Sequence, residues 1–242
     1  LSGEEASMLV MMDESGFVAL PCSQDHKRVG EGDVGLNTGG MGAYAPAPVV
    51  TPEVHARAIS EIVEPMHAYL SSQEIPYRGC LYVGLMIDSE GSPSVVEYNV
   101  RFGDPETQVT IPLISSDLFD LLLAVAQGNL SESMPSFSDA HALTVVLSAE
   151  GYPGPPVKGR LITGNVSSDW INSLEGKCTI HHAGTSIVDG VIISTGGRVL
   201  AATGISSDSL EHARELAYQR LSDVQLEGSF FRRDIGHKVL KK

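Results

Sequence analysis

The strongest constraint on the fold is a pair of β-rich runs separated by a short turn. Residues Cys80–Asp88 and Ser94–Val100 are rich in apolar and β-branched side chains, and the polar segment between them contains Gly and Pro. This pattern predicts a β-hairpin. Because side chains two apart in a strand face the same side, Glu97, Asn99 and Arg101 are predicted to line one face of its second strand.

A second hairpin is predicted near the start of the chain, where Met8–Asp13 and Phe17–Pro21 flank a turn with Gly16. A polar, Gly-rich stretch follows from Ser23 to Tyr44. Connections of this length without secondary structure are usually functional or disordered. We therefore interpret this stretch as a functional loop.

Two helices are expected in the first part of the chain. Apolar residues at helical spacing begin after Thr51, the expected N-cap, and Pro65 is a candidate kink in this helix. The second helix is expected over Asp117–Gln127 and should end at Gly128.

The fold class predicted from these elements is α+β, with an antiparallel sheet and helices followed by a β-rich part. A polar, Ser-rich segment with a proline marks a boundary, which divides the chain into domains 1–135 and 136–242. The second domain should contain one amphipathic helix, over about Ser209–Ser222, with Asp208 and Glu211 as its capping box. The expected buried stripe of this helix is Leu210, Ala213, Ala217 and Leu221.

Composition argues against several classes of function. The formal charge is −14, so the overall electric field repels nucleic acid and anionic membranes. Cys22, Cys80 and Cys178 lack the spacing of a zinc site or a disulfide framework, which indicates a reducing, cytoplasmic environment. No apolar run is long enough for a membrane span. A polyanionic substrate would therefore need a bound cation, clustered Lys and Arg, or backbone N–H groups.

The alternating polar residues of the predicted hairpin suit phosphate chemistry. Glu97 and Asn99 offer the oxygen ligands that Mg²⁺ prefers, and this ion is commonly shared with substrate phosphates. Arg101 would clamp a phosphoryl oxygen. Asp104 and Glu106 follow on a turn, and either is a candidate catalytic group that holds an amine or a further cation. The alternative, a hairpin with solvent-facing polar residues, fits the spacing about as well.

A second group of candidate residues lies in the long polar stretch. Asp25, His26, Lys27 and Arg28 place three basic side chains beside an acid on an otherwise acidic chain. The Gly-rich segment after them would let backbone N–H groups cradle a phosphate. A solvated charged turn is the alternative. The candidate substrate-binding residues of the Gly-rich segment are Asn37, Thr38, Gly39, Gly40, Met41 and Gly42.

Longer motifs resemble the glycinamide ribonucleotide synthetases of the ATP-grasp superfamily, over essentially the whole chain. The resemblance implies the carboxyl-terminal portion of an ATP-grasp domain followed by a small β-rich terminal domain. Leu36 departs from it, since a proline is usual there, and so does the Pro155–Pro156 pair. The motifs that carry the resemblance are Ser23–Gly30, Asn37–Tyr44, Glu97–Gln108, Gly151–Gly154, His182–Thr185 and Gly196–Leu200.

The resemblance implies ATP-dependent ligation of glycine to 5-phosphoribosylamine through a glycyl phosphate, in de novo purine biosynthesis. Mg²⁺ or Mn²⁺ on Glu97 and Asn99 would neutralise ATP, Arg101 would act at the transferred phosphoryl group, and Glu5 would lie near the nucleotide ribose. The resemblance also implies that the amino-terminal half of the enzyme is absent and would be a partner. Two alternatives remain open: an ATP-grasp ligase with another amine acceptor, and a non-catalytic remnant that serves as a binding module.

Overall fold

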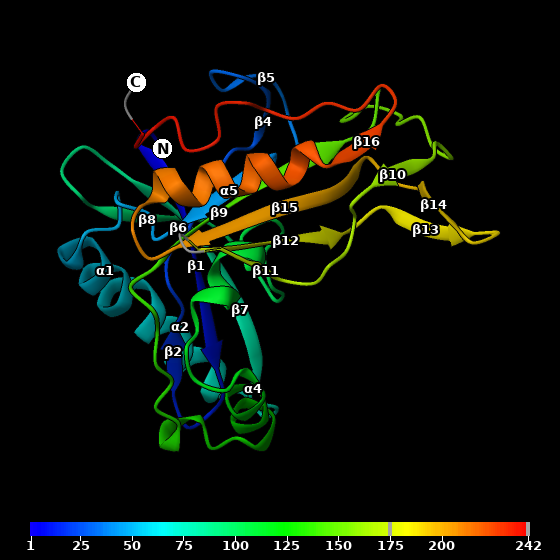
Figure 1. Cartoon of the computed structure of the whole chain (residues 1–242). Coiled ribbons are helices and arrows are strands. Elements are labelled where there is room, and N and C mark those ends of the chain that lie inside the picture. Colours follow the sequence, from blue (N-terminus) through cyan, green and yellow to red (C-terminus); the bar gives the residue numbers. More distant parts are fainter. Residues whose placement is uncertain (174–175, 241–242) are drawn as a thin grey trace. The chain divides into compact units, whose positions relative to one another are not determined.

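The computed structural model describes residues 1–173 and 176–240 (Figure 1). The chain divides into two compact units, of which the first comprises Leu1–Gln24 and Ala45–Ser138. The second comprises Asp25–Tyr44 and the chain from Asp139 onward. This division differs from the predicted one because residues 25–44 belong to the second unit, where Met41 and Tyr44 are buried in the core. Among the described residues, no helix has the length and hydropathy needed to span a membrane.

The first unit is built on a four-stranded antiparallel sheet in the order β2-β1-β7-β8. Both predicted hairpins are present in it. The first joins β1 (Glu4–Met12) to β2 (Phe17–Ala19), although β1 begins earlier than predicted. The second joins β7 (Gly79–Ile87) to β8 (Pro93–Asn99).

An interrupted helix packs on one face of this sheet. It consists of α1 (Pro52–Ala58), a π-helical segment (Ile59–Val63) and α2 (Glu64–Ser71). Thr51 caps its start through its side chain, as predicted. The π-helical segment ends two residues before Pro65, whose backbone nitrogen carries no hydrogen to donate. We therefore attribute the interruption to this proline.

Helix α4 (Leu118–Gln127) packs on the other face. As predicted, Asp117 caps it and Gly128 ends it, with a φ of 77°. Strand β1 is consequently covered on both faces, which explains its nearly continuous apolar sequence. Its residues Met8, Val10 and Met12 pack on the α1–α2 side, and Leu9 and Met11 on the α4 side. Short helices complete the unit at Thr107–Thr110 (α3), Ile111–Leu113 (η2) and Leu130–Glu132 (η3).

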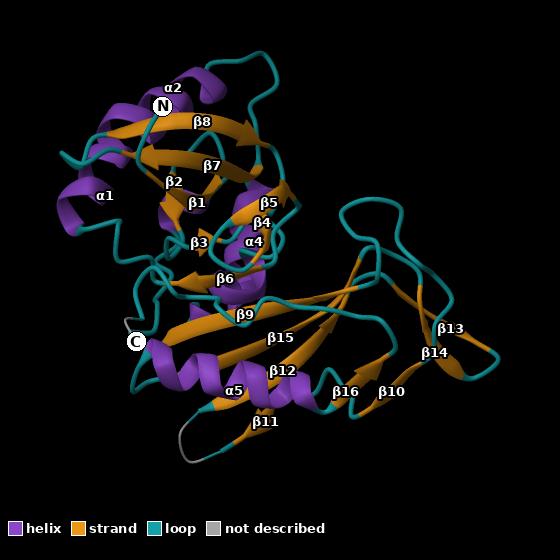
Figure 2. Ribbon diagram, turned by 90° about the horizontal axis from the view of Figure 1, so that it is seen from above, coloured by secondary structure: helices purple, strands orange, loops and turns teal. Residues whose placement is uncertain are grey.

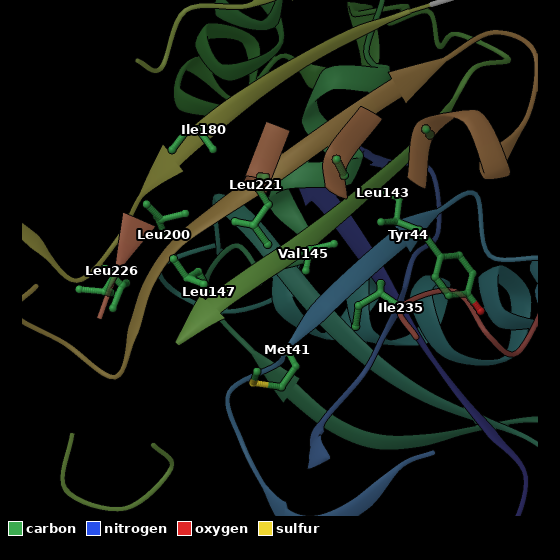
Figure 3. Close-up of a cluster of buried hydrophobic side chains, with 14 of the residues drawn as sticks. Met41, Tyr44, Leu143, Val145, Leu147, Ile180, Leu200, Leu221, Leu226 and Ile235 are labelled. Carbon is green, nitrogen blue, oxygen red and sulfur yellow. The ribbon is translucent and has the colours of Figure 1, made fainter. Parts of the chain in front are cut away.

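The second unit is built on a six-stranded sheet in the order β11-β12-β15-β9-β6-β3, and Figure 2 shows α5 (Leu210–Ser222) lying across it. The side chains between helix and sheet form one buried apolar cluster (Figure 3). The strands are β3 (Gln24–Asp25), β6 (Gly42–Ala45), β9 (His141–Ser148), β11 (Ile171–Asn172), β12 (Lys177–His182) and β15 (Arg198–Ser206).

Three two-stranded ribbons accompany the large sheet. The stretch from Ser23 to Tyr44, which we interpret as a functional loop, is not a loop throughout, because four short strands, β3 to β6, begin within it. The ribbons pair β4 (Arg28–Gly30) with β5 (Val34–Asn37), β10 (Ile162–Gly164) with β16 (Val224–Leu226), and β13 (Thr185–Val188) with β14 (Val191–Ser194).

Helix α5 has the predicted buried stripe but not the predicted cap. All four residues expected in the stripe are buried. The N-cap is Ser209, whose hydroxyl accepts a hydrogen bond from the His212 backbone at 3.1 Å. The carboxylate of Asp208 instead lies 3.5 Å from Nδ1 of the His212 ring. The capping box of Asp208 and Glu211 is therefore corrected to a serine cap.

Candidate active site

A β-bulge in β8 determines which way Glu97 points. Leu85 opposes Val95 and Gly84 opposes Glu97, so Val96 is an extra residue in the ladder. Val95 packs against the core on the α1–α2 side of the sheet. Regular alternation would turn Glu97 toward that same buried side. The extra residue places Glu97 on the opposite face.

Glu97 and Asn99 therefore lie on one face of β8, opposite Gly84 and Tyr82 of β7. Glycine at position 84 leaves room for the carboxylate, because a Cβ there would lie 3.2 Å from Cγ of Glu97. Within the described part of the chain, neither the Glu97 nor the Asn99 side chain has a hydrogen-bond or ion-pair partner. Two free oxygen donors on a paired strand fit a hard divalent cation.

Arg101 lies just beyond the end of β8 and is exposed. One N–H of its guanidinium donates to the Phe102 carbonyl at 3.0 Å. The other guanidinium N–H groups have no acceptor among residues 1–173 and 176–240. The side chain thus remains available for an anionic group of a ligand.

The structure distinguishes the two acids that follow. Asp104 is exposed, and its carboxylate accepts a hydrogen bond from the Gln108 amide at 2.8 Å. Glu106 is only 4% exposed. Its carboxylate accepts a hydrogen bond of 3.3 Å from the Ser7 hydroxyl, which also lies 2.9 Å from the Tyr82 hydroxyl. Asp104 is therefore accessible to a small amine, whereas Glu106 ties its turn to β1 and β7.

In the second unit, His26 is buried instead of facing solvent. The ring is fully buried, and Nε2 accepts the Gly236 N–H at 2.9 Å. Because Nε2 is an acceptor, the ring proton lies on Nδ1, which is 3.5 Å from the Asp33 carboxylate. Burial lowers the pKa of His26 below its ordinary value of 6.5. The ring is consequently neutral at pH 7.

Several basic side chains lie around the Asp33 carboxylate. Arg232 donates to it at 2.8 Å, and His237 and Lys238 place nitrogen atoms at 3.4 and 3.6 Å. The hydrogen bond from His26, the hydrogen bond from Arg232 and the charge of Lys238 hold the pKa of Asp33 far below its ordinary range, although partial burial acts in the other direction. Its φ of 57° is left-handed, which costs a non-glycine residue about 1 kcal/mol or more. The surrounding contacts offset that cost.

A metal at this cluster is disfavoured, although His26, Asp33 and His237 bring their ligand atoms within 4.8 Å of one another. The Gly236 N–H fixes the proton on Nδ1 of His26, so the nitrogen that faces Asp33 has no lone pair to offer. The Arg232 guanidinium already binds the carboxylate. We therefore regard the cluster as a structural network that joins the β4–β5 ribbon to the end of the chain.

The expected cradle of N–H groups in the Gly-rich segment needs correction. Four consecutive N–H groups, from Thr38 to Met41, already donate hydrogen bonds within the second unit. A phosphate would have to displace these bonds, so the side chains of the segment remain the candidates for contact with a ligand. The acceptors are the carbonyl of Lys27 for Thr38 (2.7 Å), the hydroxyl of Tyr152 for Gly39 (2.9 Å), the hydroxyl of Thr38 for Gly40 (2.9 Å) and the carbonyl of His26 for Met41 (2.8 Å).

The other predicted site residues differ in accessibility. Asp25 is buried and Lys27 half-buried, whereas Asn37 is exposed. Arg28 is also exposed and donates to a carbonyl of its own ribbon, that of Gly35, at 2.8 Å. Glu5 lies half-buried in β1 of the first unit. The basic cluster seen in the sequence is therefore only partly on the surface.

Sequence reasoning missed several residues that organise the second unit. Asp33, Tyr152, Arg198 and Arg232 each bind a segment far from them in the sequence. Tyr152 and Arg198 belong to motifs that we noted without assigning them a role. Asp33 follows Gly32 in a turn, which is at most a weak signal of a special backbone conformation.

Comparison with known proteins identifies the family. Residues 1–107 match the family described as "Phosphoribosylglycinamide synthetase, ATP-grasp (A) domain", and residues 142–238 match its C domain. The chain is 45% identical to a phosphoribosylamine–glycine ligase of Xanthomonas campestris pv. campestris, and 46% identical to one of Chlorobaculum tepidum. These matches cover 100% and 99% of this chain, but 55% of either relative. The chain thus spans about half the length of these relatives.

Solved structures agree with these matches. The crystal structure of a phosphoribosylamine–glycine ligase from Thermotoga maritima is similar over 97% of this chain and 56% of that one, with a TM-score of 0.83 and 36% identity. A biotin carboxylase from Campylobacter jejuni shares the fold alone, at 13% identity and a TM-score of 0.64 over 95% of this chain and 47% of that one. With matches to two domains of one family and an α+β fold shared with ATP-grasp enzymes, the chain belongs to the phosphoribosylglycinamide synthetase family.

Proposed function

We propose that this chain provides the metal-binding and acceptor-binding portions of an ATP-dependent ligase that joins glycine to 5-phosphoribosylamine. The products are glycinamide ribonucleotide, ADP and phosphate, in a cytoplasmic step of de novo purine biosynthesis. The observation that carries the proposal is the pair of free oxygen donors, Glu97 and Asn99, in a chain whose relatives are named phosphoribosylamine–glycine ligase.

The proposed cofactors are ATP and Mg²⁺ or Mn²⁺. A cation held by Glu97 and Asn99 would neutralise negative charge on the phosphates, which is the main requirement of phosphoryl transfer. Arg101 donates its free guanidinium N–H groups to the transferred phosphoryl group. Glu5 is proposed to lie near the nucleotide ribose.

The reaction proceeds in two steps. The glycine carboxylate attacks the terminal phosphorus of ATP, and the bond from that phosphorus to the ADP oxygen breaks. The amine of phosphoribosylamine then attacks the glycyl carbonyl carbon, and phosphate leaves. The attacking amine must lose a proton, and the exposed carboxylate of Asp104 is the proposed acceptor. Glu106 keeps the turn that carries Asp104 in place through Ser7.

The phosphoribosyl group of the acceptor is proposed to bind at the segment that ends in the Gly-rich run. Exposed Arg28 and half-buried Lys27 supply positive charge on a chain whose formal charge is −14. Asn37 and Thr38 supply side-chain hydrogen-bonding groups. Asp25 and His26 are buried at the start of this segment, and they are proposed to stabilise it. The proposed partners are small molecules and an amino-terminal half of the enzyme, and neither nucleic acid nor membrane is proposed.

A ligation assay tests this proposal. The chain is mixed with the separately produced amino-terminal portion of a relative, and ADP formation is measured. We expect ADP to form only when ATP, glycine and phosphoribosylamine are all present, and only when both halves are present, because each half supplies part of the site.

Two other results would change the assignment. ADP formation with a different amine, and none with phosphoribosylamine, would indicate another acceptor. No ADP formation by two folded halves that bind each other would indicate a non-catalytic binding module.

A further inference from the structure

Gly39 of the Gly-rich segment is held by two side chains from distant parts of the second unit. Its N–H donates to the Tyr152 hydroxyl at 2.9 Å. Its carbonyl accepts a hydrogen bond from the Arg198 guanidinium at 2.7 Å. Both polar backbone groups of an exposed loop residue are therefore bound by side chains that lie 113 and 159 residues away in the sequence.

The same two side chains fit against glycines. The Arg198 guanidinium lies over Gly39, where a Cβ would be 2.9 Å from Cζ of the arginine. The Tyr152 ring lies over Gly197, where a Cβ would overlap the ring. A larger residue at either glycine would push one of these side chains away. The contact is thus built by four residues together.

The residues on both sides of Gly39 are also fixed. The Thr38 hydroxyl donates to the Lys27 carbonyl at 2.8 Å and accepts the Gly40 N–H at 2.9 Å. Met41 is fully buried in the core of the second unit. Gly39 is the exposed residue between these two anchors, so Tyr152 and Arg198 fix the part of the segment that faces solvent.

We propose that Tyr152 and Arg198 are positioning residues for the acceptor-binding loop. They order Gly39 and its neighbours before a ligand arrives, so that binding does not have to supply that ordering free energy. The C domain of the family would then contribute to acceptor affinity without touching the acceptor. The identity of the acceptor rests on the proposed function, but the ordering of the loop does not.

The first test measures loop order without any ligand. Amide hydrogen exchange at Gly39 is followed by NMR in the whole chain and in its Tyr152→Phe and Arg198→Met variants. Loss of one hydrogen bond is expected to speed exchange at Gly39 about tenfold. Tyr77→Phe is the matched control, since it removes a hydroxyl that donates to the Cys80 carbonyl at 2.8 Å in the first unit. It should leave exchange at Gly39 unchanged.

The second test measures binding. Glycinamide ribonucleotide is titrated into the same variants, and we expect its affinity to fall about tenfold while the affinity for Mg²⁺-ATP stays constant. Gly39→Ala should have the same effect as Arg198→Met, because its Cβ displaces the guanidinium. The variant that combines Gly39→Ala with Arg198→Met should bind the ribonucleotide no more weakly than either single variant does, because both substitutions remove the same contact.

The outcomes separate this inference from the proposed function. Unchanged exchange at Gly39 in both variants would overturn the inference, and so would faster exchange with unchanged ribonucleotide affinity. If the unaltered chain binds no ribonucleotide, the acceptor site proposed for this chain is contradicted. Exchange at Gly39 alone then decides whether Tyr152 and Arg198 order the loop.

Discussion

Replacement of Arg232 by methionine is expected to lower the free energy of unfolding of the second unit by about 3 kcal/mol. The Arg232 side chain is 1% exposed and donates to Asp234 twice, at 2.8 Å each, as well as to Asp33 and to the Arg28 carbonyl. Its removal takes the arginine away from both carboxylates, and Lys238 remains 3.6 Å from Asp33. This value is at the lower end of the loss of stability expected when one partner of a buried ion pair is removed. The side chains of Asp33 and Asp234 are 30% and 20% exposed, so water can hydrate both carboxylates.

Trp170 makes this expectation measurable. It is the only tryptophan of the chain, it lies in the second unit, and Lys177 sits over its ring at 4.9 Å. Denaturant unfolding followed by its fluorescence therefore reports on this unit. Arg233→Met is the matched control, because the neighbouring arginine is exposed and should change stability by less than about 0.5 kcal/mol. Equal losses in the two variants would show that the Asp33 network does not stabilise the unit.

The second large effect is a dependence of stability on pH that arises at His26. Burial lowers its pKa in the folded chain below the ordinary 6.5. The unfolded chain therefore takes up this proton at a higher pH than the folded chain does. The stabilisation is fully present above pH 6.5. It is lost as pH falls toward the folded pKa, by about 1.4 kcal/mol per pH unit.

Two carboxyl groups extend this loss at lower pH. The pKa values of Asp33 and Asp234 are both lowered in the folded chain. The hydrogen bond from His26 lowers the pKa of Asp33. Burial raises the pKa of Asp234, but the hydrogen bonds from Arg232 outweigh it. Their contribution is present above about pH 4, and it is lost as pH falls further. Stability should therefore decline in two stages, first below pH 6.5 and then below pH 4.

His26→Gln isolates the first stage. Its side-chain oxygen can still accept the Gly236 N–H, but it does not titrate. The variant should be less stable at pH 7, and its difference from the unaltered chain should shrink between pH 6.5 and 5. His182→Gln, at an exposed position of the same unit, should keep the original slope. Parallel stability curves for His26→Gln and the unaltered chain would mean that His26 is not the titrating group.

The elements that could be predicted from the sequence are those whose signals, such as an apolar run or a capping residue, lie within the element itself or directly beside it. In the two hairpins of the first unit, apolar runs mark three of the four strands, and β8 alternates polar and apolar residues, so each strand can be recognised beside a glycine turn. Helix α4 has both of its end signals, Asp117 and Gly128. The buried stripe of α5 follows from its helical period. Motif resemblance then supplied the family.

The features that were missed depend on contacts between distant residues. The strands between Ser23 and Tyr44 have two to four residues each, too few to show a period. The extra residue Val96 is visible only once β8 is paired with β7. The neutral state of His26 could not be predicted either, because it follows from burial of the ring among distant segments, one of which contains Gly236, 210 residues away.

Calorimetric titration of Mg²⁺-ATP into the chain and its Glu97→Ala variant tests the central claim, that β8 carries the metal and nucleotide site. Glu90→Ala is the control, at an exposed acid in the turn before the same strand. We predict metal-dependent binding that falls more than about tenfold in Glu97→Ala and is unchanged in Glu90→Ala. Equal metal-dependent binding by all three proteins, or none by the folded, unaltered chain, would contradict a preformed metal site on β8.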